Sequence, residues 1–273
     1  MDARPIGVFD SGFGGITVLA EVAKLLPGED LIFLGDNLHA PYGDRSPAEV
    51  LAYTRAAVDL LLAQDCKAIV IACNTATSAA GAAVRQAYSL PIIGIEPALK
   101  PAELLPGEGN VLVMATAMTL RLEKFHLLMQ RYGQHAIPVP CPGLVELIEA
   151  GEVAGERMQA MLHALLSPHL KDPVKAVVLG CTHYVFLRPT LAAFLPGSVQ
   201  LVDGNLGTAR QLHAQLMQHD LLRDSEPAAP GGRTIRFAST APGDAIPRRM
   251  EAWFTRALAL AGAACISQTG TVQ

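Results

Sequence analysis

Two short segments of the chain carry the same pattern, and together they could perform chemistry. Residues 67–75 read Lys-Ala-Ile-Val-Ile-Ala-Cys-Asn-Thr, and residues 175–183 read Lys-Ala-Val-Val-Leu-Gly-Cys-Thr-His. Each segment is a lysine, an apolar strand, a small residue, a cysteine and two polar residues. Two thiols facing each other across one small anion could remove a proton from one face of a carbon and deliver a proton to the other face. Cys73 and Cys181 therefore predict a site for stereochemical inversion.

The position of the two cysteines favours reactive thiols. Each cysteine follows an apolar strand and precedes a predicted helix, and ligands of open α/β sheets bind at the carboxyl ends of strands. A helix N-terminus offers unpaired N–H groups and lowers a thiol pKa from about 8.5 towards neutrality. Asn74, Thr75, Thr182 and His183 would add donors for a small carboxylate. A single cysteine after a buried strand is more often inert packing, and the matched contexts argue against that interpretation here.

The remaining cysteines, Cys66, Cys141 and Cys265, lack this context, and we expect them to be structural. The five cysteines are odd in number and contain no CxxC pair. This argues against a disulfide framework, a zinc ribbon and a thiol–disulfide oxidoreductase. The histidines form no metal-ligand pattern with carboxylates or cysteines, so the sequence predicts no metal.

Two loops could complete the site. Residues 10–15, Asp-Ser-Gly-Phe-Gly-Gly, follow the first predicted strand, and their glycines permit a tight turn close to an anion. The turn has neither the Walker ending nor the spacing of a dinucleotide fingerprint. Asp10 could orient an ammonium group or polarise a base, and an ordinary N-cap remains the alternative. Pro41, Tyr42 and Gly43 follow the second strand at the same edge, where Tyr42 could equally cover the loop.

Two further side chains could assist a proton transfer. His183 lies two residues after Cys181, and Glu149 ends a short predicted helix after Cys141. The alternatives are a structural histidine and a surface carboxylate.

Composition excludes several classes of protein. The 273 residues are 51% hydrophobic and 17% charged, which argues for a compact globule and against disorder. A net charge of −4 gives no basic field for nucleic acid. The longest uncharged apolar runs, such as 257–266, are about half of the roughly 20 residues that a spanning helix needs. The first residues lack a secretory pattern. We therefore expect a cytoplasmic protein without nucleic-acid or membrane partners.

The elements that position these residues alternate between buried strands and helices. Predicted strands at 6–9, 31–34, 68–72 and 92–95 alternate with helices at 16–26, 47–64 and 75–88. A second series has strands at 111–114, 137–139, 176–179 and 200–202 and helices at 119–132, 143–150, 154–168 and 205–219. A Pro/Gly-rich linker at 224–232, a strand at 234–238 and a helix at 244–262 close the chain. This alternation predicts parallel sheets with helices on both faces.

We expect two α/β domains, one of residues 1–97 plus 207–273 with Cys73, and one of residues 98–206 with Cys181. The closing strand and helix could belong to either half on their pattern alone. A chain that leaves the first domain, builds the second and returns would connect the two domains through a hinge of two chain segments.

Together the motifs resemble those of bacterial glutamate racemases. The matching blocks, in family order, are residues 10–15, 41–43, 72–77, 94–97 and 180–184. The resemblance implies two similar doubly wound parallel-sheet domains related by a pseudo-twofold axis, with the active site in the cleft between them. It also implies interconversion of L- and D-glutamate without pyridoxal phosphate or metal, supply of D-glutamate for peptidoglycan, and a homo-oligomer, most simply a dimer.

The resemblance also implies roles for individual residues. Cys73 corresponds to the cysteine assigned to the α-proton of the D-enantiomer, and Cys181 to the one assigned to the L-enantiomer. Asp10, Glu149 and His183 match polar residues that assist the thiols. The implied substrate-binding residues are Asp10, Ser11, Pro41, Tyr42, Gly43, Asn74, Thr75, Thr116, Thr119, Thr182 and His183.

One departure and two alternatives accompany this interpretation. Leu122 and Phe125 stand where the family usually has a serine and a tyrosine, whereas Thr116 and Thr119 keep a hydroxyl near the substrate. A racemase of aspartate or another small amino acid is the alternative enzyme. A binding or regulatory protein on the same scaffold is the alternative of another class, and the presence of both cysteines argues against it.

Overall fold

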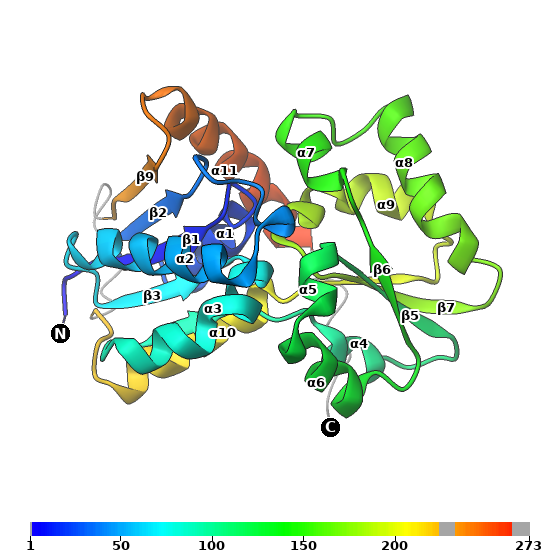
Figure 1. The fold of residues 1–273 in the computed structure, drawn as a ribbon, viewed down its shortest axis with the longest axis horizontal. Helices are drawn as coiled ribbons and strands as arrows, with labels where there is room; N and C mark the ends of the chain where they lie inside the picture. Colours follow the sequence, from blue (N-terminus) through cyan, green and yellow to red (C-terminus); the bar gives the residue numbers. More distant parts are fainter. Residues whose placement is uncertain (1, 224–232, 264–273) are drawn as a thin grey trace.

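The computed structural model describes residues 2–223 and 233–263 of the chain. The linker predicted at 224–232 and Cys265 lie outside these residues. Figure 1 shows one parallel sheet with its helices at the left and a second at the right. The predicted architecture of two parallel-sheet α/β units is confirmed.

The first sheet, sheet A, has the strand order β4-β3-β1-β2-β9, and all neighbouring strands are parallel. Its strands are β1 (Ile6–Asp10), β2 (Leu31–Gly35), β3 (Ala68–Ile71), β4 (Ile92–Gly94) and β9 (Ile235–Ser239). One face packs on α1 (Ile16–Leu25), beside which lie α10 (Asn205–Gln218) and α11 (Ala245–Ala263). The other face packs on α2 (Pro47–Leu62) and α3 (Asn74–Ala87). Cover on both faces explains why these strands are apolar at successive positions.

The second sheet, sheet B, has the order β6-β5-β7-β8 and is also parallel. Its strands are β5 (Asn110–Ala115), β6 (Ala136–Pro140), β7 (Val174–Leu179) and β8 (Gln200–Val202). One face packs on α7 (Leu144–Glu149), α8 (Glu156–Leu166) and α9 (Arg188–Phe194). The other packs on α4 (Leu99–Glu103) and α6 (Glu123–Tyr132), while α5 (Ala117–Arg121) leads towards α3 of the first unit.

The repeat in the sequence corresponds to a repeat in topology. Read from β8 to β6, sheet B has the order of the strands from β4 to β2 in sheet A, and β9 is the addition at the edge of sheet A. The cysteine-bearing segments follow β3 and β7, which occupy the same place in the two sheets.

The closing segment of the chain packs on the first sheet. β9 pairs with β2 in parallel, from Leu31 opposite Ile235 to Gly35 opposite Ser239. α11 then packs against α1. Of the two placements that the sequence left open, the closing strand and helix therefore lie with sheet A.

The helix predicted at 119–132 is wrong as a single element. Leu122 is extended, with φ −77° and ψ 145°, and separates α5 from α6. The break lets Leu122 pack towards the core between sheet A and α3, whereas Phe125 is buried in the core between sheet B and α4. A straight helix would not direct both side chains into these two cores.

The helices α4 and α9 and the 3₁₀ helix η1 (Tyr42–Asp44) were not predicted. The helix expected directly after Cys181 is present as the 3₁₀ helix η3 (Thr182–Leu187). Within the described ranges, no helix combines the length and the apolar character needed to cross a bilayer.

Candidate active site

The candidate site lies where the strand order of each sheet reverses. In sheet A the chain passes from β1 to β2 on one side and returns to β3 on the other, and β5, β6 and β7 repeat this path in sheet B. Ligands of open α/β sheets bind at such points, beyond the carboxyl ends of the strands. Asp10 ends β1 and Cys73 follows β3, while Thr116 follows β5 and Cys181 follows β7. The two cysteines thus stand at equivalent corners of the two sheets.

A single cavity of about 150 Å³ is lined by both thiols. The sequence-predicted residues in its wall are Ser11, Pro41, Tyr42, Gly43, Cys73, Asn74, Thr75, Thr116, Cys181, Thr182 and His183. Asp10, Thr119 and Glu149 lie behind the wall, and each is hydrogen-bonded to a residue in it. A larger hollow of about 640 Å³, lined by parts of α6 and α10, is bordered by neither thiol, so its size alone does not make it the site.

Cys73 is the N-cap of α3. Its Sγ accepts a hydrogen bond from the Ala76 N–H at 3.4 Å, and Ser11 Oγ lies 3.4 Å away. Burial and then the Asp10 charge raise the pKa of Cys73 to about 12, although the contacts with Ser11 and Ala76 lower it. The sequence-based expectation of a lowered pKa is wrong for this thiol, because lost hydration outweighs the helix terminus. A pKa this high leaves Cys73 as a neutral thiol at pH 7.

Cys181 faces a charged pair. His183 Nδ1 lies 3.8 Å from Cys181 Sγ, and His183 Nε2 lies 2.9 Å from Glu149 Oε1. Burial opposes the charge on His183, but hydrogen bonds to Cys181 and Glu149 outweigh it and hold the pKa of His183 well above its usual value. Burial likewise raises the pKa of Glu149, but the contact with His183 outweighs it, and this pKa lies below its usual value. An imidazolium ion can thus donate to Glu149 on one side and to a Cys181 thiolate on the other.

Asp10 joins the two halves of the site. It accepts a hydrogen bond from the Gly12 N–H at 2.9 Å and another from Thr182 Oγ1 at 3.1 Å. Burial raises the pKa of this carboxyl, and His183, Gly12 and Thr182 oppose the rise. The side chain does not line the cavity. It is bound to Thr182 in the wall, and its charge contributes to the raised pKa of Cys73.

Three hydroxyls form a second contact between the halves. Thr75 Oγ1, at the start of α3, lies 3.0 Å from Thr116 Oγ1 and 3.0 Å from Thr119 Oγ1, and the latter two are 2.9 Å apart. Beside them, the buried Asn74 Oδ1 has no hydrogen-bond partner within the described ranges. Asn74 lines the cavity, so a ligand with an N–H donor would satisfy this atom.

The sequence did not single out several residues around the cavity. Cys141 also lines it, with a thiol that is buried and donates to the Val139 carbonyl at 3.3 Å, and burial raises its pKa to about 12. Asp36 binds the hydroxyl of Tyr42, and Arg249 binds the carbonyl of Glu149. The position of Cys141 just after β6 was a usable signal. Asp36 and Arg249 stand out only once the packing is known.

Fold and site together define a class of protein. Two thiols at the ends of equivalent strands, sharing one small cavity, form the arrangement of an isomerase that exchanges protons on two faces of a carbon. The family model of Asp/Glu/hydantoin racemases matches residues 6–212. The chain belongs to this family.

Individual relatives agree with the family. The glutamate racemase of Clostridium perfringens is 47% identical over 225 residues, which cover 81% of this chain and 86% of that protein. The crystal structure of Francisella tularensis glutamate racemase in complex with D-glutamate has a TM-score of 0.79 at 31% identity, covering 94% of this chain and 95% of that chain. The crystal structure of Escherichia coli glutamate racemase in complex with L-glutamate and the activator UDP-MurNAc-Ala has a TM-score of 0.80 at 30% identity, covering 93% of this chain and 95% of that chain. The resemblance found in the motifs is confirmed, and with it the class of enzyme, an amino-acid racemase.

Proposed function

We propose that this chain interconverts L- and D-glutamate, with Cys73 and Cys181 as the two acid/base groups. The observation that carries the proposal is the shared cavity, because both thiols line it from equivalent strand ends. Relatives at 47% and 49% identity over about four fifths of this chain are glutamate racemases, which supports glutamate as the substrate.

The proposed reaction with L-glutamate begins with Cys181 as thiolate and Cys73 as thiol. Cys181 takes the α-proton, so a C–H bond breaks and an S–H bond forms. Cys73 then gives its proton to the opposite face of the α-carbon and becomes the thiolate. The reverse reaction starts from that second state. The imidazolium of His183 supports the thiolate of Cys181, and the high pKa of Cys73 supports a neutral thiol as its starting form.

The carbanion-like transition state needs donors that are already in place, because an amino-acid α-proton is only weakly acidic. We propose that the amino ends of α3 and η3 supply them, as the first N–H groups of a helix have no partner within it. Asn74 and Thr75 start α3, and Thr182 and His183 start η3. Ser11, Thr116, Thr119 and the segment Pro41–Gly43 complete the proposed binding surface.

The test is circular dichroism of L-glutamate, and in parallel of L-aspartate, with chelator-treated protein free of pyridoxal phosphate. We expect the glutamate signal to decay to zero and the aspartate signal to persist. Decay with aspartate alone would keep the mechanism and replace the substrate. Decay with neither would contradict the proposed reaction and favour a binding protein.

Cysteine variants test the two-base mechanism. Cys73→Ala and Cys181→Ala should each abolish racemisation, whereas Cys66→Ala should retain it. Cys66 is a suitable control because it is equally buried but precedes β3, at the amino edge of sheet A. Substantial turnover in either active-site variant would contradict the mechanism.

The setting of the enzyme is also a proposal. The four cysteines in the described ranges are free thiols, and a mechanism that needs two of them suits a reducing compartment. We therefore propose that the enzyme is cytoplasmic. We also propose that its D-glutamate is used for peptidoglycan.

Two proposals concern the organisation of the protein. We propose that the chain forms a homodimer, to be tested by light scattering. We also propose two domains, one of residues 1–97 plus 207–273 and one of residues 98–206.

A further inference from the structure

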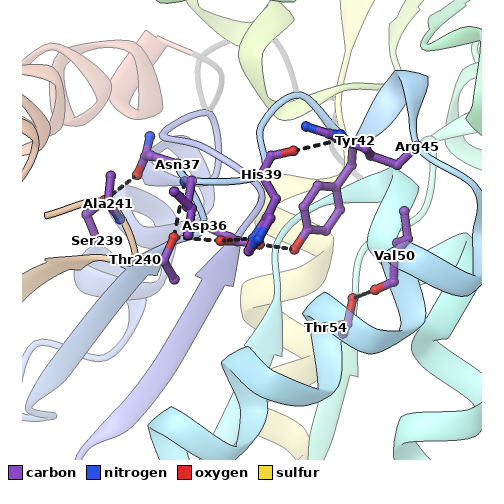
Figure 2. A network of polar contacts seen from close by, with 11 residues as sticks. Asp36, Asn37, His39, Tyr42, Arg45, Val50, Thr54, Ser239, Thr240 and Ala241 are labelled. Atoms are coloured by element: carbon purple, nitrogen blue, oxygen red, sulfur yellow. Dashed lines mark hydrogen bonds and ion pairs between the residues drawn. The ribbon is translucent and has the colours of Figure 1, made fainter.

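A buried carboxylate lies behind the cavity and takes no part in the proposed proton transfers. Asp36 follows β2 directly, and its side chain is 3% exposed. Among the described residues, three side chains contact it (Figure 2). Thr240 Oγ1 donates to Oδ1 at 2.6 Å, Tyr42 Oη donates to Oδ2 at 2.6 Å, and His39 Nδ1 lies 2.9 and 3.0 Å from the two oxygens.

Tyr42 is the member of this cluster that reaches the cavity. It lies in the wall together with Pro41 and Gly43, and its side chain is almost fully buried. Its hydroxyl has one proton, which it donates to Asp36. The bond to Asp36 therefore fixes where the side chain of Tyr42 lies in the wall.

The other two contacts connect Asp36 to distant parts of the fold. His39 stacks on Tyr53 of α2, with ring centroids 3.9 Å apart and planes inclined by 11°. Thr240 follows β9, the closing strand at the edge of sheet A. The loop that carries Tyr42 is thus held through one carboxylate to α2 and to β9. Hydrogen bonds to a charged group are shorter and stronger than those between neutral groups.

We propose that Asp36 is a positioning residue for substrate binding: through the hydroxyl of Tyr42 it holds the 41–43 segment against the cavity. This inference rests on the proposed racemisation, because its effect is measured on that reaction. Asp36 touches no reacting atom. The alternative is a purely structural carboxylate that fastens β9 to β2.

The chain contains a matched control for that alternative. Asp30 stands immediately before β2, as Asp36 stands immediately after it. Asp30 Oδ1 accepts hydrogen bonds from the Thr234 N–H at 2.7 Å and from Thr234 Oγ1 at 2.8 Å, just before β9. Each end of β2 thus carries an aspartate bound to a threonine that flanks β9. Asp30→Asn should loosen this contact at the amino end of β2, whereas the cavity lies beyond the carboxyl ends of the strands.

The experiment compares Asp36→Asn, Tyr42→Phe, their double variant and Asp30→Asn, with KM and kcat for glutamate and Tm measured for each. Loss of a hydrogen bond to a charged group predicts a rise in KM of about tenfold for Asp36→Asn and for Tyr42→Phe, with a smaller change in kcat. If Asp36 acts through Tyr42, the KM of the double variant should be no higher than that of the single variant with the higher KM. Asp30→Asn should lower Tm and leave KM unchanged.

Three results would overturn the proposal: an unchanged KM in Tyr42→Phe, losses that multiply in the double variant, or a KM for Asp36→Asn that matches that of Asp30→Asn. Tyr42→Phe leaves Asp36 with His39 and Thr240, so it gives a result even if Asp36→Asn does not fold. A wild-type protein inactive on glutamate would contradict the proposed function, and this inference with it. An active wild type with any of the three results contradicts this inference alone.

Discussion

The two thiols of the cavity have different surroundings. Cys73 lies among neutral donors and near the Asp10 carboxylate, whereas Cys181 lies beside the His183 imidazole that Glu149 holds. The sequence repeat suggested two similar half-sites, and the side chains that follow each cysteine make them different. The raised pKa of Cys73 agrees with its proposed role as the proton donor for L-glutamate, and the activity should depend on the charge of His183.

Glu149→Gln tests this dependence through pH. The carboxylate raises the pKa of His183, so its neutralisation should lower that pKa and let His183 lose its proton at a lower pH. We expect the alkaline limb of kcat/KM for L-glutamate to move to lower pH. Glu152→Gln is the control, since Glu152 pairs with Arg157 on the surface. An alkaline limb at the same pH in Glu149→Gln would show that His183 does not govern it.

The same pair predicts how stability varies with pH. The lowered pKa of Glu149 contributes stability that is present above its unfolded value of 4.5 and is lost as pH falls through the folded value. The raised pKa of His183 contributes stability that is complete below its unfolded value of 6.5 and is lost as pH rises through the folded value. The difference in Tm between wild type and Glu149→Gln should therefore be largest between pH 4.5 and 6.5. A difference that stays constant from pH 4 to 10 would contradict the ion pair.

At the scale of elements, the glycine turn after β1 fits against the helix that follows Cys181. A Cβ on Gly14 would lie 2.3 Å from His183 Nδ1 and 2.6 Å from Thr182 Oγ1. These side chains cannot move aside freely, because Glu149 and Asp10 hold them. The absence of a side chain at Gly14 is therefore needed for this close contact between the two halves of the site.

Gly14→Ala should lower kcat/KM at least tenfold, and overpacking should cost about 1–3 kcal/mol of unfolding free energy. Gly207→Ala is the control. Gly207 lies in α10. Within the described ranges, no heavy atom outside its chain neighbours and the nearby backbone of that helix lies within 4 Å of a Cβ built there, so alanine should stabilise the helix by about 0.5–1 kcal/mol without altering kcat/KM. Urea unfolding and the racemisation assay measure both effects. Equal kinetics of the two variants would contradict the close contact at Gly14.

The elements that sequence predicted best are those with strong local signals. The buried strands have apolar runs, and α2 has Ser46 as N-cap, Pro47 at its first position and Glu49 completing a capping box, all present in the structure. The break at Leu122 and the short helices α4 and α9 have no such signal, since they depend on which core each side chain enters. The same reason separates the site residues: Cys73 and Cys181 follow a local pattern, whereas Asp36 is tied to Thr240, 204 residues further along the chain.

At the scale of the whole molecule, the closing helix reaches from the first unit to the second at the site. α11 packs on α1, and its Arg249 donates to the carbonyl of Glu149, the last residue of α7. The guanidinium of Arg249 also lies 5.1 Å from the ring centroid of Phe13, whose ring is 5.5 Å from that of His183. The chain that returns to sheet A thereby supports the charged pair beside Cys181.

Arg249→Met should lower kcat/KM about fivefold, the effect expected from loss of one hydrogen bond of about 1 kcal/mol. Arg256→Met is the control on the same helix, where the guanidinium lies over the ring of Trp253, 5.3 Å from its centroid. Steady-state kinetics at saturating and limiting glutamate separate the two variants. Equal kcat/KM values for both would show that α11 does not support the site.

The matching strand orders of the two sheets have a consequence for how such a site can change over evolutionary time. If a site were formed between two identical chains, every substitution would appear in both half-sites, and the half-sites would stay identical. Here the two copies of the strand–cysteine segment belong to one chain, and each can accept substitutions that the other does not share. Thr182-His183 could thus arise beside one cysteine while Asn74-Thr75 stayed beside the other. The two faces of the planar, carbanion-like α-carbon are not equivalent, because its other substituents differ. A chain that carries both half-sites can therefore place different side chains beside each face.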